Sequence, residues 1–270
     1  TVFLGARGAT NFDLVVDLRE GGHHSGNWGG LLANPGVILA HALSTIVSET
    51  GKIQIKDWLP EPMSNSTRAL LADITVEAGE HAPEIDPNWG EADLNPAQQV
   101  YSWNSFDVLA FKTGNPDHPV NAIPPHARAH CQIRYIQGSK REEFLPALRK
   151  HLDAHGFNMV AIEPPPAGNA AGFVASRTDP DHPWARWASA SIERTSGKPT
   201  AVIPQLGGSI CNDLFTDLLG LPTIWIPHSY GACSQHAPNE HILLSEARDA
   251  IQLMAGVYWD LGEPDTPDKQ

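Results

Sequence analysis

The strongest candidate for metal chemistry is a polar loop near the carboxyl end of the chain, SQHAPNEH at residues 234–241. A short apolar run precedes it, and α/β enzymes place functional side chains in loops of this kind. A neutral imidazole is a good ligand for Zn²⁺, and a nearby carboxylate such as Glu240 can orient its other nitrogen. His236 is therefore a candidate metal ligand, although a histidine in a polar loop is often only solvated.

Three further segments carry residue types suited to binding a small substrate. They are the glycine-rich loop GGHHSGNWGG (21–30), which contains His24, the polar strand that carries Arg134, and the glycine turn 207–209. A guanidinium is a planar, two-point donor for a carboxylate. Each segment also has a simpler interpretation. The glycine-rich loop could be a hairpin whose histidines have no function, Arg134 could be a solvated or salt-bridged side chain, and the turn 207–209 could be a strand-to-helix turn with serine as the helix cap.

Taken together, these segments resemble the M20 metallopeptidases, and most closely their dipeptidase branch of cytosolic nonspecific and carnosine-type enzymes. The resemblance is carried by motifs that occur in the family's order and cover nearly the whole chain. These are Arg7-Gly8, HSGxxGG from His24 to Gly30, the lid segment from Asn121 to Arg134, GGSI from Gly207 to Ile210, and HAPNE around His236.

The resemblance implies metal-assisted hydrolysis of an amide bond in dipeptides or related small substrates. His236 would be a ligand to one of two Zn²⁺ or Mn²⁺ ions. His24 would reach the site from the lid of a partner subunit and stabilise the oxyanion of the scissile carbonyl. The family uses one kind of site for peptidases and for amidohydrolases that act on N-acyl amino acids, so the second activity is the alternative within this class.

The same resemblance assigns the substrate-binding residues. Arg134 would bind the terminal carboxylate of the substrate, and Asn121 would assist it, although the dipeptidases have threonine at that position. Gly208 and Ser209 would contact the substrate near the metals. The expected partners are a small peptide or N-acyl amino acid and a second copy of the chain, which would form a homodimer through the lid.

In the M20 family the remaining metal ligands precede the lid, and this chain opens where the lid is about to begin. It also lacks an initiator Met, which suggests a processed, truncated or trimmed chain. His151-Leu152-Asp153 and Glu142-Glu143 imitate metal and base motifs, but both lie in a predicted amphipathic helix. We therefore expect the 270 residues alone to be inactive. A non-catalytic module that self-associates through its lid is the alternative from another class.

The elements that would position these residues fall into two groups. Alternating apolar residues predict strands at 10–18, 105–111 and 127–135, in the last of which Arg128, His130, Gln132 and Arg134 share the polar face. A helix is predicted from Asn34 as cap to Gly51, another over 68–78, and a third behind a Ser139/Glu142 capping box. A strand at 158–162 completes the order strand–helix–strand–strand–helix–strand, which favours a ferredoxin-like lid.

The second group begins after residue 173, where helices are predicted at 183–195, 210–219 and 245–259, with a buried run at 223–227. This alternation fits the carboxyl-terminal portion of an α/β catalytic domain of the zinc-peptidase type. The predicted division is 1–9 for the end of an amino-terminal catalytic segment, 10–173 for the lid and dimerisation domain, and 174–270 for the rest of the catalytic domain.

Composition excludes some classes of function. The chain has 31 acidic and 18 basic residues, a net charge of −13, which argues against a nucleic-acid partner. It contains no apolar run near the roughly 20 residues that span a membrane, and its first residues, TVFLGARG, have neither the basic region nor the apolar run expected of a signal peptide. The three cysteines are widely spaced and odd in number, which indicates a reduced, cytoplasmic protein.

Overall fold

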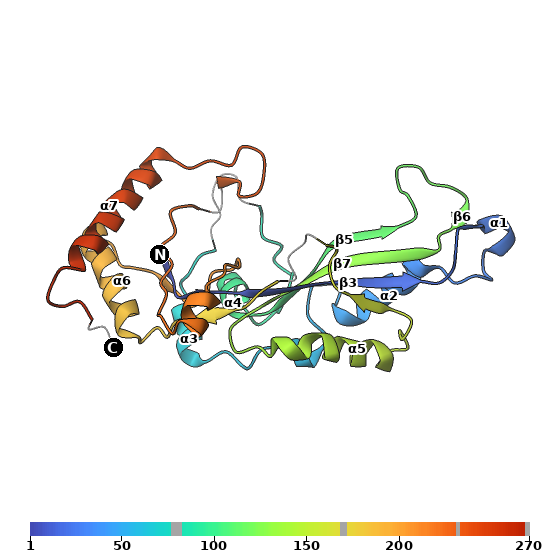
Figure 1. Ribbon diagram of the computed structural model, residues 1–270, viewed down its shortest axis with the longest axis horizontal. Coiled ribbons are helices and arrows are strands. Elements are labelled where there is room, and N and C mark those ends of the chain that lie inside the picture. Colours follow the sequence, from blue (N-terminus) through green and yellow to red (C-terminus); the bar gives the residue numbers. More distant parts are fainter. Residues whose placement is uncertain (77–82, 168–171, 231–232, 268–270) are drawn as a thin grey trace.

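The computed structural model describes residues 1–76, 83–167, 172–230 and 233–267. Its centre is an antiparallel sheet built on two long strands, β3 (Gly8–Asp17) and β7 (His126–Tyr135). The edge strands are β5 (Ser105–Thr113) and β8 (Ala161–Glu163), so that the order is β5-β7-β3-β8. Helices α2 (Pro35–Ile46) and α5 (Phe144–Ala154) lie on one side of the sheet (Figure 1). This confirms the ferredoxin-like lid.

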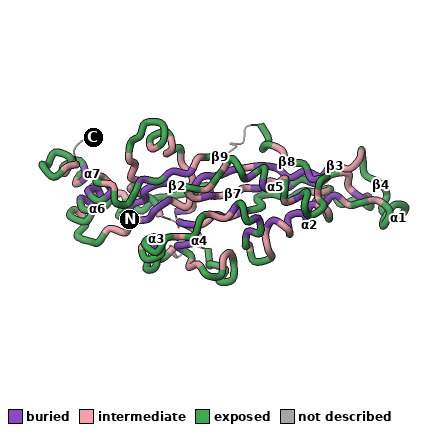
Figure 2. Tube along the Cα trace, turned by 90° about the horizontal axis from the view of Figure 1, so that it is seen from below, coloured by how far each residue is buried: buried purple, intermediate pink, exposed green. Residues whose placement is uncertain are grey.

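The main core lies between this sheet and its two helices. Alternate residues of β7 from Ala127 to Tyr135 are buried, while the residues between them are not, as the period of two predicts. Trp58, in the short 3-10 helix η1 (Lys56–Trp58), is fully buried, and its indole N–H donates to the Phe144 carbonyl at 2.9 Å. In Figure 2 the buried segments run along β3 and β7 through the middle of the molecule.

The other end of the molecule consists of short strands and two packed helices, α6 (Pro183–Ser196) and α7 (Leu244–Asp260). β1 (Val2–Phe3) pairs in parallel with β11 (Val202–Ile203), and β2 (Gly5–Ala6) pairs with β10 (Ser176–Arg177). Val2, Trp187 and Ile192 belong to its small core. This end is a mixed α/β structure, as expected.

Six shorter elements complete the lid among the described residues. β4 (His23–His24) pairs with β6 (Ala122–Ile123), and α1 (Ser25–Trp28) follows β4 directly. Between α2 and β5 lie α3 (Asn65–Leu70) and α4 (Pro96–Ser102). A two-residue strand, β9 (Gly172–Phe173), extends the pairing of β3. In the described ranges, no helix is both long and apolar enough to cross a membrane.

Several predicted boundaries within the lid are wrong. The helix capped by Asn34 ends at Ile46 rather than Gly51, because Val47 is extended and bridges to Ile53. The helix predicted over 68–78 is instead α3, which ends at Leu70; residues 77 and 78 lie outside the described residues.

The predicted capping box is also absent. The Ser139 hydroxyl bonds the side chain of Asn104, and residues 141–143 form the 3-10 turn η2 (Arg141–Glu143) ahead of α5. The strand expected at 158–162 is reduced to β8.

The carboxyl-terminal half departs from the prediction at two places. The helix expected at 210–219 is a single π-helical stretch, η3 (Leu214–Leu218). The run 223–227 is not a buried strand: Trp225 is 43% exposed and makes only an isolated bridge to Phe3. The other two helices are confirmed, and Gly197 ends α6 in a left-handed conformation, φ 67°.

Candidate functional site

Two predicted substrate-binding residues meet where the lid sheet reaches the carboxyl-terminal half. Arg134 lies on the face of β7 opposite to the buried residues, and its Nη1 donates to the hydroxyl of Ser209 at 3.0 Å. Seventy-five residues separate the two in the chain. Gly208, beside Ser209, is exposed, so this stretch of backbone is accessible to a ligand.

The glycine turn 207–209 is held by the segment that leads into β3. The Leu206 amide donates to Gly5 O at 2.8 Å, and the Arg7 amide donates to Leu206 O at 3.0 Å. The Arg7 Nε also donates to Gly207 O at 2.9 Å. Gly207 leaves no room for a side chain, since a Cβ there would lie 2.8 Å from Val100 Cγ1. The turn therefore has a fixed position relative to Arg134.

Charge at this place is positive on balance. Arg7 and Arg134 interact as like charges, and the carboxylate beside both is Asp107. Burial, followed by the repulsion from Arg134, lowers the pKa of Arg7 to about 10. Burial raises the pKa of Asp107, against the opposing effect of the two cations. Two guanidiniums and one carboxylate leave a net positive site, which suits the carboxylate of a ligand.

The other two predicted residues of the lid, His24 and Asn121, lie together at its tip. His24 pairs with Ala122, and the amide of Ser25 donates to Asn121 O at 2.9 Å. The exposed imidazole of His24 accepts through Nδ1 from the Gly26 amide at 3.1 Å. In the neutral ring this places the proton on Nε2, so that His24 presents a free N–H donor.

One chain does not bring the two pairs together. Eight residues of β7 separate His126, beside the tip, from Arg134, which corresponds to about 26 Å of strand. In Figure 1, α1 and β6 lie at one end of the molecule and α6 and α7 at the other. The donor of His24 and the guanidinium of Arg134 are thus two separate half-sites.

The predicted metal ligand His236 lies in an exposed loop just before α7. Its backbone is left-handed, φ 60°, as are those of Ser234 (58°) and Asn239 (64°), a conformation that costs energy for residues other than glycine. The loop is closed by the bond from the His241 amide to Cys233 O at 3.0 Å. Within the described ranges, no three His, Cys, Asp or Glu side chains group as a metal site. The described residues therefore do not by themselves fit a two-metal centre, which needs several ligands for each ion.

The two segments that resemble a metal-binding motif and a catalytic-base motif, residues 151–153 and 142–143, have structural roles in α5 and η2. His151 is in α5 and its Nε2 lies 2.9 Å from Thr45 O, while Leu152 is fully buried. Asp153 pairs with Arg149 one turn earlier. Glu142 and Glu143 form the 3-10 turn before the same helix.

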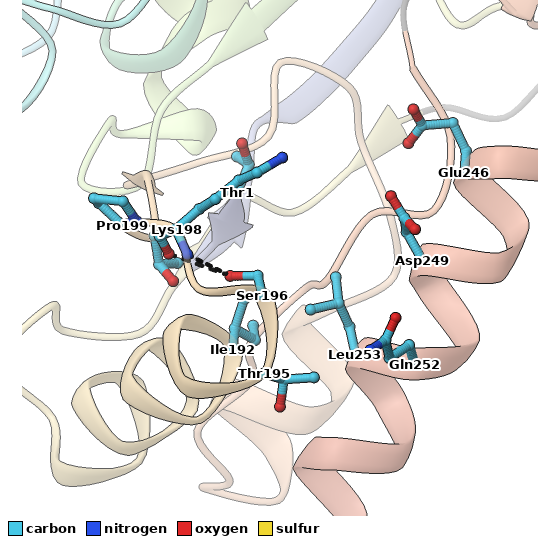
Figure 3. Close-up of a pocket in the computed structure, with 11 residues that line it drawn as sticks. Thr1, Ile192, Thr195, Ser196, Lys198, Pro199, Glu246, Asp249, Gln252 and Leu253 are labelled. Carbon is cyan, nitrogen blue, oxygen red and sulfur yellow. Dashed lines mark hydrogen bonds between the residues drawn. The ribbon is translucent and has the colours of Figure 1, made fainter.

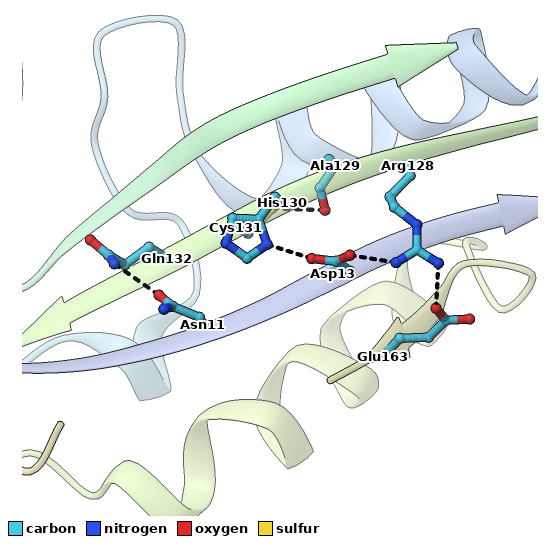
Figure 4. Close-up of polar contacts among 8 residues, drawn as sticks. All are labelled: Asn11, Asp13, Arg128, Ala129, His130, Cys131, Gln132 and Glu163. Carbon is cyan, nitrogen blue, oxygen red and sulfur yellow. Dashed lines mark hydrogen bonds and ion pairs between the residues drawn. The ribbon is translucent and has the colours of Figure 1, made fainter. Parts of the chain in front are cut away.

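A polar network on the open face of the lid sheet was not anticipated. Asp13, only 1% exposed, accepts from Arg128 Nη1 and contacts His130 Nδ1, both at 2.5 Å (Figure 4). Arg128 also pairs with Glu163 at 2.8 Å. The polar face predicted for β7 indicated that Arg128 and His130 share one side of the strand. Their partners Asp13 and Glu163 come from β3 and β8, and sequence spacing does not reveal them.

Two cavities adjoin these elements. The larger, about 470 Å³, lies between α6, α7 and residue 1, and contains none of the predicted site residues (Figure 3). The smaller, about 230 Å³, is lined in part by Arg7 and Asp107, and so borders the Arg134 site.

Comparison with known proteins places this geometry in a family. Residues 4–160 match the model of the peptidase dimerisation domain of the M20 peptidases. The chain is 24% identical to the Cys-Gly metallodipeptidase DUG1 of Saccharomyces cerevisiae over 275 residues, 93% of this chain and 53% of that protein. It is 23% identical to a cysteinylglycine-S-conjugate dipeptidase of Corynebacterium striatum over 210 residues, 76% of this chain and 44% of that protein.

Solved structures agree on the fold. An M20 family metallo-carboxypeptidase from Sulfolobus solfataricus superposes with a TM-score of 0.75 at 22% identity, over 95% of this chain and 59% of that one. Human carnosine dipeptidase 1 gives 0.74 at 16% identity, over 97% and 57%. The chain spans about half the length of the curated relatives it matches. From the match over residues 4–160 we conclude that this chain belongs to the M20 peptidase family.

Proposed function

We propose that these residues form the lid and the carboxyl-terminal part of the catalytic domain of a two-metal hydrolase that acts on dipeptides. The observation that carries the proposal is the Arg134–Ser209 hydrogen bond, which joins predicted substrate residues from two separate motifs in a net positive site. Two curated relatives are named as dipeptidases, which supports the substrate class. The division at residues 9/10 and 173/174 belongs to this proposal.

Within the proposed site, Arg134 holds the carboxylate at the end of the substrate. Its guanidinium offers two parallel N–H groups, and the bond to Ser209 fixes its orientation. The exposed backbone at Gly208, together with the Ser209 hydroxyl, contacts the adjoining peptide group. These interactions bind and orient the substrate, and so fix the position of its scissile amide relative to the catalytic groups.

His24 supplies the N–H donor for the oxyanion, and it does so from a second copy of the chain. The length of β7 between the lid tip and Arg134 supports an action across a homodimer formed through the lid. Asn121 lies beside His24 and would contact the same substrate. The match to a dimerisation domain supports the assembly.

His236 is proposed as one ligand of the metal pair, Zn²⁺ or Mn²⁺, which would activate water for attack on the amide. The other ligands must come from outside the described residues. Large apolar side chains are exposed along α7, the helix that follows the His236 loop, among them Leu244 (73% exposed), Ile251 (72%) and Trp259 (76%). Such a surface supports a further catalytic segment packed at this end. On this account the 270 residues alone are inactive.

The test uses the complete gene product, loaded with Zn²⁺ or Mn²⁺, and a panel of dipeptides and N-acyl amino acids. Hydrolysis of dipeptides supports the proposal, while hydrolysis of N-acyl amino acids alone replaces it with a deacylase. Metal analysis of the 270-residue chain is the companion measurement. Two tightly bound ions per chain would contradict the ligand assignment, and a metal-free, inactive dimer from a complete gene product would favour a non-catalytic module.

A further inference from the structure

Arg7 lies just before β3 and is a buried arginine, with only 8% of its surface exposed. Burial and the repulsion from Arg134 lower its pKa to about 10, while Asp107 attracts it. A buried charge that a second cation repels costs free energy in the folded state. The charge of Arg7 therefore does not account for its place in the structure, and its hydrogen bonds are the other candidate.

The hydrogen bonds of Arg7 lead to the glycine turn 207–209. Its amide donates to Leu206 O at 3.0 Å, and its Nε donates to Gly207 O at 2.9 Å. Among the described residues, Gly207 O is the last backbone group before Ser209 that has a hydrogen-bond partner. The Nε of Arg7 is thus the backbone anchor nearest to Ser209.

Ser209 depends on this anchor for its position. Its hydroxyl accepts from Arg134 Nη1 at 3.0 Å, and so orients the guanidinium that is proposed to hold the substrate carboxylate. Along the described chain, the next hydrogen bonds after Ser209 are those of Asn212, whose Nδ2 donates to a side chain of β10 at 3.1 Å. Gly208 restricts the backbone between these points very little. Without the anchor, Ser209 would be free to move away from Arg134.

We propose that Arg7 is a positioning residue of the proposed hydrolase, which acts on the substrate carboxylate through the turn 207–209 and not by contact. This inference rests on the proposed function and adds to it a residue that keeps Ser209 on Arg134. The grip of Arg134 on a carboxylate is the same in the bound substrate and in the transition state. A displaced turn should therefore weaken substrate binding more than it slows the chemical step.

Two neutral variants separate the hydrogen bond of Arg7 from its charge. In Arg7→Gln, the side-chain amide nitrogen takes the place of Nε along the side chain, so that a donor for Gly207 O remains. Arg7→Met has the same number of atoms up to that point and places a methyl carbon there. Both variants lose the charge, so a difference between them reports the hydrogen bond alone. Because the lost charge is buried and repelled, both should unfold at a urea midpoint close to that of the wild type.

The experiment measures kcat and KM for Gly-Leu with the metal-loaded complete gene product, and urea unfolding of each variant is the control for folding. We expect Arg7→Met to raise KM about tenfold and to leave kcat within about threefold, on the scale of a lost hydrogen bond to a charged group. Arg7→Gln should raise KM by about threefold or less. In a Ser209→Ala background, Arg7→Met should add less than about twofold, because Arg7 acts through Ser209.

The outcomes separate this inference from the proposed function. If the complete gene product hydrolyses no dipeptide, the proposed function fails and the inference fails with it. If Gly-Leu is hydrolysed and Arg7→Met and Arg7→Gln have the same KM, the inference alone is overturned. The same factor from Arg7→Met with and without the Ser209 hydroxyl would also overturn it. A rise in KM that accompanies a clear fall in the urea midpoint would assign Arg7 to the fold instead, and so contradict the positioning role.

Discussion

The role of His24 can be separated into a structural part and a chemical part. Its Nδ1 accepts from the Gly26 amide at 3.1 Å and caps α1, while its Nε2 is left as a donor. His24→Asn keeps an acceptor at a position that favours Asn, but removes the Nε2–H group. His24→Ala removes both. Comparison of the two variants therefore shows which function is used.

The expected size of each effect follows from the structure. A lost N-cap costs about 1 kcal/mol locally. α1 has four residues, none of them buried, so neither variant should change the free energy of global unfolding by more than about 0.5 kcal/mol. A lost oxyanion donor costs about 2.7–4 kcal/mol of transition-state stabilisation, which lowers kcat by about two to three orders of magnitude.

The assay is steady-state hydrolysis of Gly-Leu by the metal-loaded complete gene product, together with urea unfolding of the same variants. Both variants should lose turnover to the same extent while their unfolding curves match the wild type. A loss of less than about threefold in either would remove His24 from the oxyanion role. If His24→Asn stayed active and His24→Ala did not, the cap would be what matters.

Three further predictions concern the fold. Gly5→Ala should lower the free energy of unfolding by about 2 kcal/mol or more in urea titration, because the new Cβ would lie 1.9 Å from the carbonyl oxygen of Ser176 in the neighbouring strand. An unchanged urea midpoint would contradict the β2–β10 pairing. Asp13→Ala should lower the free energy of unfolding by about 2–3 kcal/mol. This is less than the usual loss for a broken buried ion pair, because its partners Arg128 and His130 are partly exposed. A loss under about 0.5 kcal/mol would refute the network. Burial raises the pKa of Cys131 to about 12, so that its thiol stays protonated and unreactive at pH 8. Iodoacetamide at pH 8 should therefore label the exposed Cys211 in the folded protein and reach Cys131 only on unfolding, which mass spectrometry measures.

The lid was predictable where one physical requirement dominates. Alternation over 127–135 describes β7 because a strand with one buried face allows no other register. Asn34 followed by Pro35 marks the start of α2, where Asn34 Oδ1 accepts from the Gly36 amide at 2.9 Å. The glycine turn and Arg134 could be named from their motifs.

The sequence was insufficient where tertiary contacts compete with local ones. The Ser139 hydroxyl was expected to cap a helix, but Asn104, thirty-five residues earlier, takes it as a partner. Arg7 and Asp107 share a site although a hundred residues separate them, and no spacing rule connects them. The helix expected at 210–219 shortened to η3, in a stretch with no buried residue to hold a longer one.

The central claim is that each active site combines the carboxyl-terminal half of one chain with His24 of another. Co-expression of His24→Ala and His236→Ala copies of the complete gene product tests it directly. Half of the dimers would then be mixed, and one of the two sites in each would have both histidines, which predicts about a quarter of wild-type activity. Activity of the mixture no higher than that of either variant alone would contradict the claim.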